Sequence, residues 1–151
     1  MDVPWDEAFF ALLTASYAGF TKAALVPPEV PRARGAAWLY REAPFCVLAH
    51  DLDADPRFIY ANKAAQACFE YSWDELIGLR SHRSAEAPNR QDRQRVLDRV
   101  AAQGFATHYR GLRIAKSGRR FWIEDGTIWQ LVDGDGVHHG QAATFSSWRD
   151  A

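Results

Sequence analysis

The five histidines are the side chains of this chain best suited to ligating a metal ion. His138 and His139 are neighbours in a strand-like segment, where successive side chains point to opposite faces, so they do not readily share one ion. His108 lies in another strand-like run with no third ligand nearby. His82 lies among Arg and Ser residues, as an exposed loop histidine does. We therefore expect no metal site.

Catalysis would need groups that the sequence does not place together. A nucleophilic Ser or Cys works beside a His and a carboxylate, and no nucleophile elbow or glycine-rich loop marks such a residue here. Glu124 and Asp125 are adjacent carboxylates, but as strand neighbours they diverge. Asp51, Asp53 and Asp55 fall in a turn and are expected to be solvated. The sequence favours a protein that is not an enzyme.

The two cysteines are expected to be reduced. Cys46 falls in a strand-like run and Cys68 in a helix-like run, and their spacing suits neither a metal site nor a disulfide framework. Reduced thiols are typical of the cytosol. The acidic N-terminus lacks the basic start of a secretion signal, and the uncharged run Ala8–Thr21 is too short to span a bilayer. We expect a cytoplasmic location without membrane contact.

Length and charge favour one globular domain. A chain of 151 residues can bury a core without disulfides or metals. The formal net charge of −1 gives no overall attraction to nucleic acid or to anionic lipid. Six arginines lie between Arg80 and Arg99, which indicates either a solvated helix face or a docking site for an acidic partner. The expected partners are a small molecule or another protein, with no direct nucleic-acid contact.

The first 35 residues are predicted to form a helix and a connector, and residues 36–151 the main domain. The Pro-rich segment Val26–Pro31 cannot continue a helix. An apolar face on residues 4–25 must be covered by the domain's own sheet or by a second subunit. We therefore expect a homodimer. The residues that recur at helical spacing are Trp5, Phe9, Leu12, Leu13, Tyr17 and Phe20.

The main domain is predicted to combine an antiparallel sheet with short helices. Asn62 suits a helix N-cap, and Ser72 with Glu75 forms a capping box, so helices are expected between residues 62 and 102. No βαβ alternation is present, which predicts an α+β fold: a five-stranded antiparallel sheet with helices on one face. A bulge is expected at Gly126. The predicted strands are residues 45–51, 57–61, 105–114, 119–132 and 137–147.

Two segments resemble the signatures of PAS domains. Phe58–Ala65 is similar to the PAS segment in which a strand ends in Asn and a helix begins. Phe69–Gly78 resembles the Gly-Tyr-Ser-x-Glu-Glu-Leu-Ile-Gly signature that follows it. Within this group the chain resembles the MEKHLA domain family, in its bacterial stand-alone type, over most of its length. That pattern is echoed by Ser84–Glu86, Gly118–Glu124, Trp129 and Gly140–Phe145.

The resemblance implies a PAS-like fold and a sensory or regulatory role. In plants this domain stands at the end of homeodomain–zipper regulators. Flavin photosensors of the PAS group carry a reactive Cys in an Asn-Cys-Arg-Phe-Leu-Gln motif, and the corresponding residues 80–86 here contain no Cys. Haem-binding members use a His on the helical side of the pocket, where His82 is a poor candidate. We expect no covalently bound flavin, no haem and no other cofactor.

The resemblance also places a candidate ligand pocket between the concave sheet face and the central helices. Aromatic walls with a few polar groups suit a flat, partly polar ligand. Trp122 and Glu124 share strand parity, and Trp129 joins them only if the strand shifts register near Gly126. Alternatively, the tryptophans are core residues and Glu124 faces water. The predicted ligand-binding residues are Trp73, Glu86, Trp122, Glu124, Trp129 and Gln141.

The predicted function is therefore a PAS-like sensory module that binds a small ligand or a protein partner and signals through partner contact. One alternative is a small enzyme acting on a metabolite in the same cavity. Another is a purely structural dimerisation module with a filled core.

Overall fold

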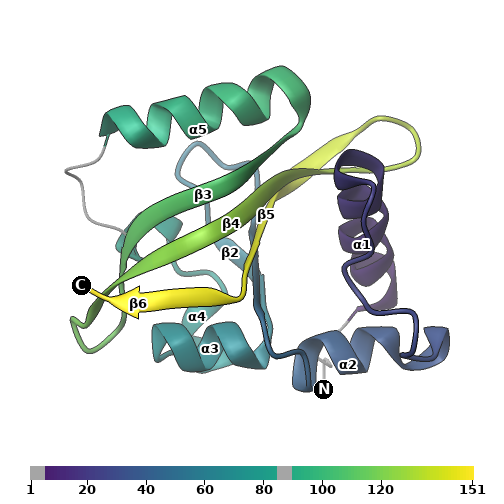
Figure 1. The fold of residues 1–151 in the computed structure, drawn as a ribbon, viewed down its shortest axis with the longest axis horizontal. Helices are drawn as coiled ribbons and strands as arrows, with labels where there is room; N and C mark the ends of the chain where they lie inside the picture. Colours follow the sequence, from purple (N-terminus) through teal and green to yellow (C-terminus); the bar gives the residue numbers. More distant parts are fainter. Residues whose placement is uncertain (1–5, 85–89) are drawn as a thin grey trace.

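The structure is a computed structural model that describes residues 6–84 and 90–151, with the side chains of residues 90–94 outside the description. The elements follow the order that the sequence predicts: N-terminal helices, two strands, the central helices and then the remaining strands (Figure 1). The helices are α1 (Glu7–Thr21), η1 (Arg32–Arg34), α2 (Gly35–Arg41), α3 (Lys63–Phe69), α4 (Trp73–Leu76), η2 (Ser81–Ser84) and α5 (Arg90–Gln103). The strands are β1 (Cys46–His50), β2 (Phe58–Ala61), β3 (Phe105–Ile114), β4 (Arg120–Val132), β5 (His138–Phe145) and β6 (Ser147–Asp150).

The strands form one antiparallel sheet in the order β2-β1-β5-β4-β3. The predicted α+β class and its five strands are confirmed. The single final strand expected over residues 137–147 is wrong, because the chain bends at Ser146. Up to Phe145 it pairs with β1, whereas from Ser147 on it pairs only with the first half of β4 and so forms β6.

The helix ends follow the capping residues of the sequence. The Asp6 carboxylate accepts hydrogen bonds from the backbone N–H groups of Ala8 and Phe9, at 2.8 and 3.3 Å, and so begins α1. Asn62 caps α3, and the predicted capping box of Ser72 and Glu75 begins α4. In the sequence, Pro4 also suits the opening of the first helix and Asn89 the N-cap of the helix that ends near Ala102, but both residues lie outside the described residues.

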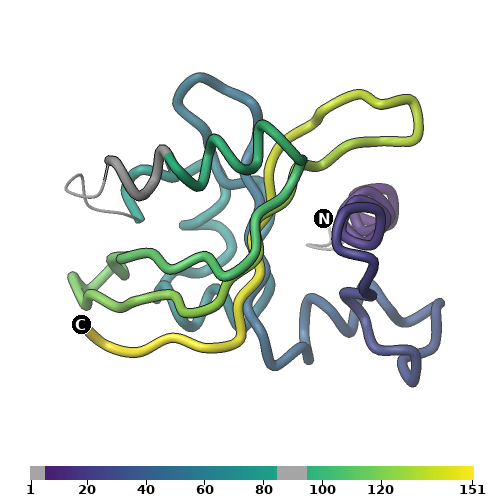
Figure 2. The backbone as a smooth tube through the Cα atoms, turned by 45° about the horizontal axis from the view of Figure 1, so that its top comes forward, coloured from purple at the N-terminus to yellow at the C-terminus, as the bar shows by residue number. Residues whose placement is uncertain are grey.

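The sheet has two covered faces, which lie on opposite sides in Figure 2. The inner face packs against α3, α4 and α5, and the outer face packs against α1 and α2. Each strand alternates between the two faces, as Cys46 and Leu48 pack inward while Val47 and Ala49 pack outward. Any side chain of the sheet can therefore be assigned to a face by its neighbours.

Helix α1 covers its own sheet, which is one of the two docking targets that the sequence left open. Trp129 of β4 is 0% exposed beneath it, and the indole Nε1 donates to the carbonyl of Leu13 at 3.3 Å. Tyr17 contacts the same indole edge-on, with ring centroids 4.8 Å apart. Burying each large side chain is worth about 1.5–3 kcal/mol, so this contact accounts for the apolar helix face. Trp5 lies outside the described residues.

Across residues 6–84 and 90–151, no helix is long and apolar enough to cross a lipid bilayer.

Candidate functional site

Two bulges in the β3–β4 pair decide which way the predicted site residues face. Tyr109 pairs with Gly126, and the register shifts on both sides of this pair. His108 and Asp125, the neighbours of the paired residues, adopt positive φ angles of 56° and 50°, and their side chains are hydrogen-bonded, with Nδ1 2.6 Å from Oδ1. The register shift expected near Gly126 is confirmed. It reverses strand parity between the two halves of β4.

This reversal places Trp122, Glu124 and Trp129 on one face of the sheet, but it is the outer face. Phe121 and Ile123 occupy the inner core, so the alternating Trp122 and Glu124 point outward. Trp129 packs with the outer cluster under α1. The expectation that these three line a cavity facing the central helices is therefore wrong.

Trp122 and Glu124 belong to a charged surface cluster. The guanidinium carbon of Arg110 lies 3.9 Å from the centroid of the Trp122 ring. The Glu124 carboxylate forms salt bridges with Nε of Arg110, at 3.4 Å, and with Nε of Arg149, at 3.1 Å. These contacts satisfy the carboxylate on the sheet surface, which agrees with the alternative that Glu124 faces water.

The helical residues of the predicted pocket do not complete it either. Trp73 packs edge-on against Tyr40 and Tyr60, at 5.7 and 6.0 Å between ring centroids. This aromatic group belongs to the outer cluster rather than to the inner face. Glu86 lies outside the described residues.

Gln141 is the predicted site residue that faces inward, and it lies in a polar row across three strands. It is paired with Gln130 of β4 on one side and with His50 of β1 on the other. Its Nε2 lies 3.5 Å from Nε2 of His50. His50 Nδ1 lies 2.9 Å from the carbonyl oxygen of Asp51, and because a carbonyl only accepts, Nδ1 must donate. In the neutral ring Nε2 is then the accepting nitrogen, and it faces the Gln141 amide.

An apolar row runs beside this polar row on the same face. The four residues are cross-strand neighbours, so together they make a flat strip of the inner face. Val96 and Val100 of α5 cover one end of the strip. The apolar row consists of Leu48, Ala143, Ile128 and Ala106.

Sequence reasoning missed His50 and Gln130. The segment Asp133-Gly134-Asp135-Gly136 has the composition of a hairpin turn, and such a turn sets β4 and β5, and so Gln130 and Gln141, opposite each other. The register shift between Leu131 and Val132 obscures that pairing, because partners on the two strands cannot be found by counting outward from the turn. His50 lies opposite Gln141 only because β1 and β5 pair across most of the chain, which no local pattern reveals.

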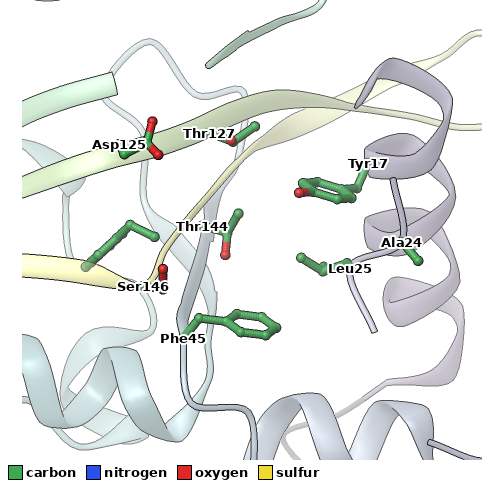
Figure 3. Close-up of a pocket in the computed structure, with 9 residues that line it drawn as sticks. Tyr17, Ala24, Leu25, Phe45, Asp125, Thr127, Thr144 and Ser146 are labelled. Atoms are coloured by element: carbon green, nitrogen blue, oxygen red, sulfur yellow. The ribbon is translucent and has the colours of Figure 1, made fainter. Parts of the chain in front are cut away.

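The outer face carries a separate groove of about 260 Å³ where the chain leaves α1 (Figure 3). Tyr17 of α1 stands on one side, and the hydroxyl residues Thr127 and Thr144 of the sheet stand on the other. Thr144 Oγ1 already donates to the carbonyl of Cys46 at 2.9 Å. The groove is lined by Tyr17, Ala24, Leu25, Phe45, Asp125, Thr127, Thr144, Phe145 and Ser146.

The histidines considered as metal ligands are separated by their own partners. His138 Nε2 contacts the carbonyl of Gly140 at 2.8 Å, whereas His139 Nε2 contacts the Asp133 carboxylate at 2.7 Å. His82 Nδ1 lies 2.9 Å from Asp55. Within the described part of the chain, no three His, Cys, Asp or Glu side chains gather closely enough to hold a metal ion.

The sheet with α3, α4 and α5 on its inner face defines a PAS-like domain. The chain is similar to the PAS domain of a protein from Colwellia psychrerythraea, with a TM-score of 0.61 and 18% identity, over 80% of this chain and 98% of that one. It is also similar to an RNA-binding Light-Oxygen-Voltage receptor, with a TM-score of 0.64 and 18% identity, over 85% of this chain and 35% of the receptor. At such identities the likeness shows the fold alone.

The chain belongs to the MEKHLA domain family, whose model matches residues 7–150. It is also 25% identical to the homeobox-leucine zipper protein ATHB-9 of Arabidopsis thaliana over 111 residues. That match takes in 74% of this chain but only 13% of ATHB-9. The family and the fold that the sequence resemblance implied are confirmed.

Proposed function

We propose that this PAS-like sensory domain binds a small, flat, partly polar ligand on the inner face of its sheet. The observation that carries the proposal is the polar row of His50, Gln141 and Gln130 beside an apolar strip. The two amides can donate to and accept from the edge of a ring, and His50 holds Gln141 from the side. Ala143, the half-buried member of the strip, offers an apolar contact beside them.

The hydrogen-bonding state of Gln130 supports a ligand at this place. Its side chain is half-buried, and within the described residues its amide makes no side-chain hydrogen bond. No buried side-chain nitrogen or oxygen of the described residues lacks a partner, so the Gln130 amide reaches solvent. It can therefore pair with a ligand edge together with Gln141.

The proposed role is binding rather than catalysis. Amides hydrogen-bond without titrating, so the row is better suited to holding a ligand than to moving protons. The expectation of no covalently bound flavin and no haem stays a prediction. It is tested by the visible absorbance of freshly purified protein.

The output is proposed to be contact with a protein partner. Gln130 alternates on β4 with Trp129 and Leu131, which pack under α1, so a ligand on the inner face adjoins the residues that hold the helix. The division of the chain at residue 35 remains a proposal. In it, residues 1–35 form a helix and a connector, and residues 36–151 form the main domain. The homodimer also remains a prediction, and α1 no longer supports it because its apolar face is used on its own sheet.

We propose a cytoplasmic location because of the state of the two cysteines. Cys46 and Cys68 are both free and buried, which suits a reducing compartment.

A thermal-shift screen against a metabolite library tests the ligand proposal. A ligand that stabilises the wild type should stabilise Glu124→Gln equally, because Glu124 lies on the outer face. The same ligand should lose most of its effect on Gln141→Leu. Equal stabilisation of all three proteins would place the site elsewhere. If the stabilising compound is consumed during incubation, the enzyme alternative is favoured.

A further inference from the structure

The two cysteines meet in the inner core although they come from different elements. Cys46 of β1 is 0% exposed and Cys68 of α3 is 4% exposed, and both belong to the same apolar cluster. Helix α3 packs directly on β1. The two side chains therefore lie in the same part of the core, where they influence each other electrostatically.

A fixed guanidinium stands beside one of the two thiols. Arg119 donates from Nη2 to the carbonyl oxygen of Cys68 and also interacts with the Cys68 side chain. Its other nitrogens are held by Glu70 at 3.1 Å and by Asp150 at 2.7 Å. The guanidinium carbon lies 4.9 Å from the centroid of the Phe121 ring. Four partners therefore keep this positive charge next to Cys68.

The environment makes the two thiols unequal. The hydrogen bond with Cys46, followed by the charge of Arg119, lowers the pKa of Cys68 against the opposing effect of burial. The same hydrogen bond, together with burial, raises the pKa of Cys46. Arg119 is fixed beside Cys68, where its positive charge favours a thiolate, so Cys68 is the expected nucleophile.

We propose that Cys46 and Cys68 form a two-thiol site that a peroxide converts into a disulfide joining β1 to α3. The proposal rests on the contact of the thiols and on the placement of Arg119, and it does not depend on the ligand proposed above. Cys68 lies in the last turn of α3, next to the final helical residue Phe69. Helix ends open more readily than helix centres, which gives a small oxidant access.

The chemistry proceeds in two balanced steps. The Cys68 thiolate attacks one peroxide oxygen, the O–O bond breaks, and hydroxide leaves, so sulfur is oxidised to sulfenic acid while peroxide is reduced. The Cys46 sulfur then attacks the Cys68 sulfur, and the sulfenic oxygen leaves as water with the Cys46 proton. Overall, two thiols and one peroxide give one disulfide and two waters. A dithiol reductant converts the disulfide back into the two thiols.

Intact-mass measurement of the full chain tests this site. Reduced wild-type protein is treated with hydrogen peroxide, quenched in acid, and alkylated with N-ethylmaleimide under denaturing conditions. We expect a product that has lost two hydrogens, carries no alkyl group and regains two reactive thiols in dithiothreitol. Two alkylated thiols after peroxide treatment, or oxidation of Cys68 to sulfinic acid without a disulfide, would overturn the proposal.

Single variants test the order of attack. In Cys46→Ala, dimedone should trap sulfenic acid on Cys68, whereas in Cys68→Ala the remaining Cys46 should stay reduced. Arg119→Gln should slow disulfide formation, because removing the guanidinium raises the pKa of Cys68 and reduces its thiolate fraction. Circular dichroism checks that each variant is folded. If a variant does not fold, the intact-mass result for the wild type decides the proposal. Peroxide attack on Cys46 in Cys68→Ala would contradict the assigned roles.

Discussion

Ser16 of α1 exchanges two hydrogen bonds with the backbone of Val132 at the end of β4. Its Oγ donates to the Val132 carbonyl at 2.9 Å and accepts from the Val132 N–H at 3.0 Å. Ser16 is only 5% exposed, so both backbone groups depend on this hydroxyl for their pairing. The contact fixes α1 to the sheet beside the proposed ligand row.

Ser16→Ala should therefore lower the free energy of unfolding by about 1 kcal/mol, because it leaves partly buried backbone groups unpaired. Chemical denaturation measures the change, and hydrogen exchange should show faster opening of α1. Thr14→Ala is the matched control, since its hydroxyl bonds within the helix to the Phe10 carbonyl at 2.9 Å. Equal losses in the two variants would show that the contact with Val132 is not special.

Trp129 and Trp122 should respond very differently to truncation. Trp129 is fully buried under α1, so Trp129→Ala should cost about 3–5 kcal/mol. Trp122 lies under Arg110 on the outer surface, and the loss of that cation–π contact should cost about 0.5–1 kcal/mol. Thermal and denaturant unfolding measure both changes. Similar costs would mean that the two indoles do not differ in burial as described.

The positive φ of Asp125 predicts which substitutions the β4 bulge tolerates. Asn adopts this backbone conformation readily, whereas a β-branched residue does not. Asp125→Val should therefore destabilise the protein by about 1–2 kcal/mol relative to Asp125→Asn, which also lacks the charge that pairs with His108. The comparison of the two variants by denaturation isolates the backbone effect. Equal stability would argue against the register shift.

Glu75 should contribute to stability only above acidic pH. Lys116, and then the Ser72 N–H, lower the pKa of Glu75 from 4.5 to about 2. Because the folded pKa lies below the unfolded value, the contribution is present above about pH 4.5 and is lost as the pH falls towards 2. Glu75→Gln keeps the capping box but removes the charge. Its unfolding free energy should vary less with pH over this range than that of the wild type.

The control for this prediction is Asp74→Asn, which neutralises the neighbouring carboxylate of α4. Both Glu75 and Lys116 are largely exposed, so added salt should weaken the difference. A pH dependence that is identical in wild type and Glu75→Gln would contradict the assignment.

Local chemistry predicted most of the fold. The N-cap at Asn62, the capping box of Ser72 and Glu75 and the first four strands follow from residues close in sequence, and the structure confirms them. The split at Ser146 was missed because it depends on where the chain stops pairing with β1, which is a long-range property.

The candidate site was harder to predict, because facing depends on register. The bulge near Gly126 was foreseen, but not that Phe121 and Ile123 would take the inner face and send Trp122 outward. The contact of Cys46 with Cys68 was missed for a related reason, since sequence spacing does not show which helix packs on which strand.

Native mass spectrometry tests the proposed ligand site most directly. Wild type and the double variant Gln130→Leu/Gln141→Leu are purified in parallel from the same host and compared under native and denaturing conditions. We predict that the native wild type carries a small molecule that is lost on denaturation and is absent from the folded double variant. Retention of the same molecule by the double variant, or equal native and denatured masses for the wild type, would contradict a ligand site on the inner face of the sheet.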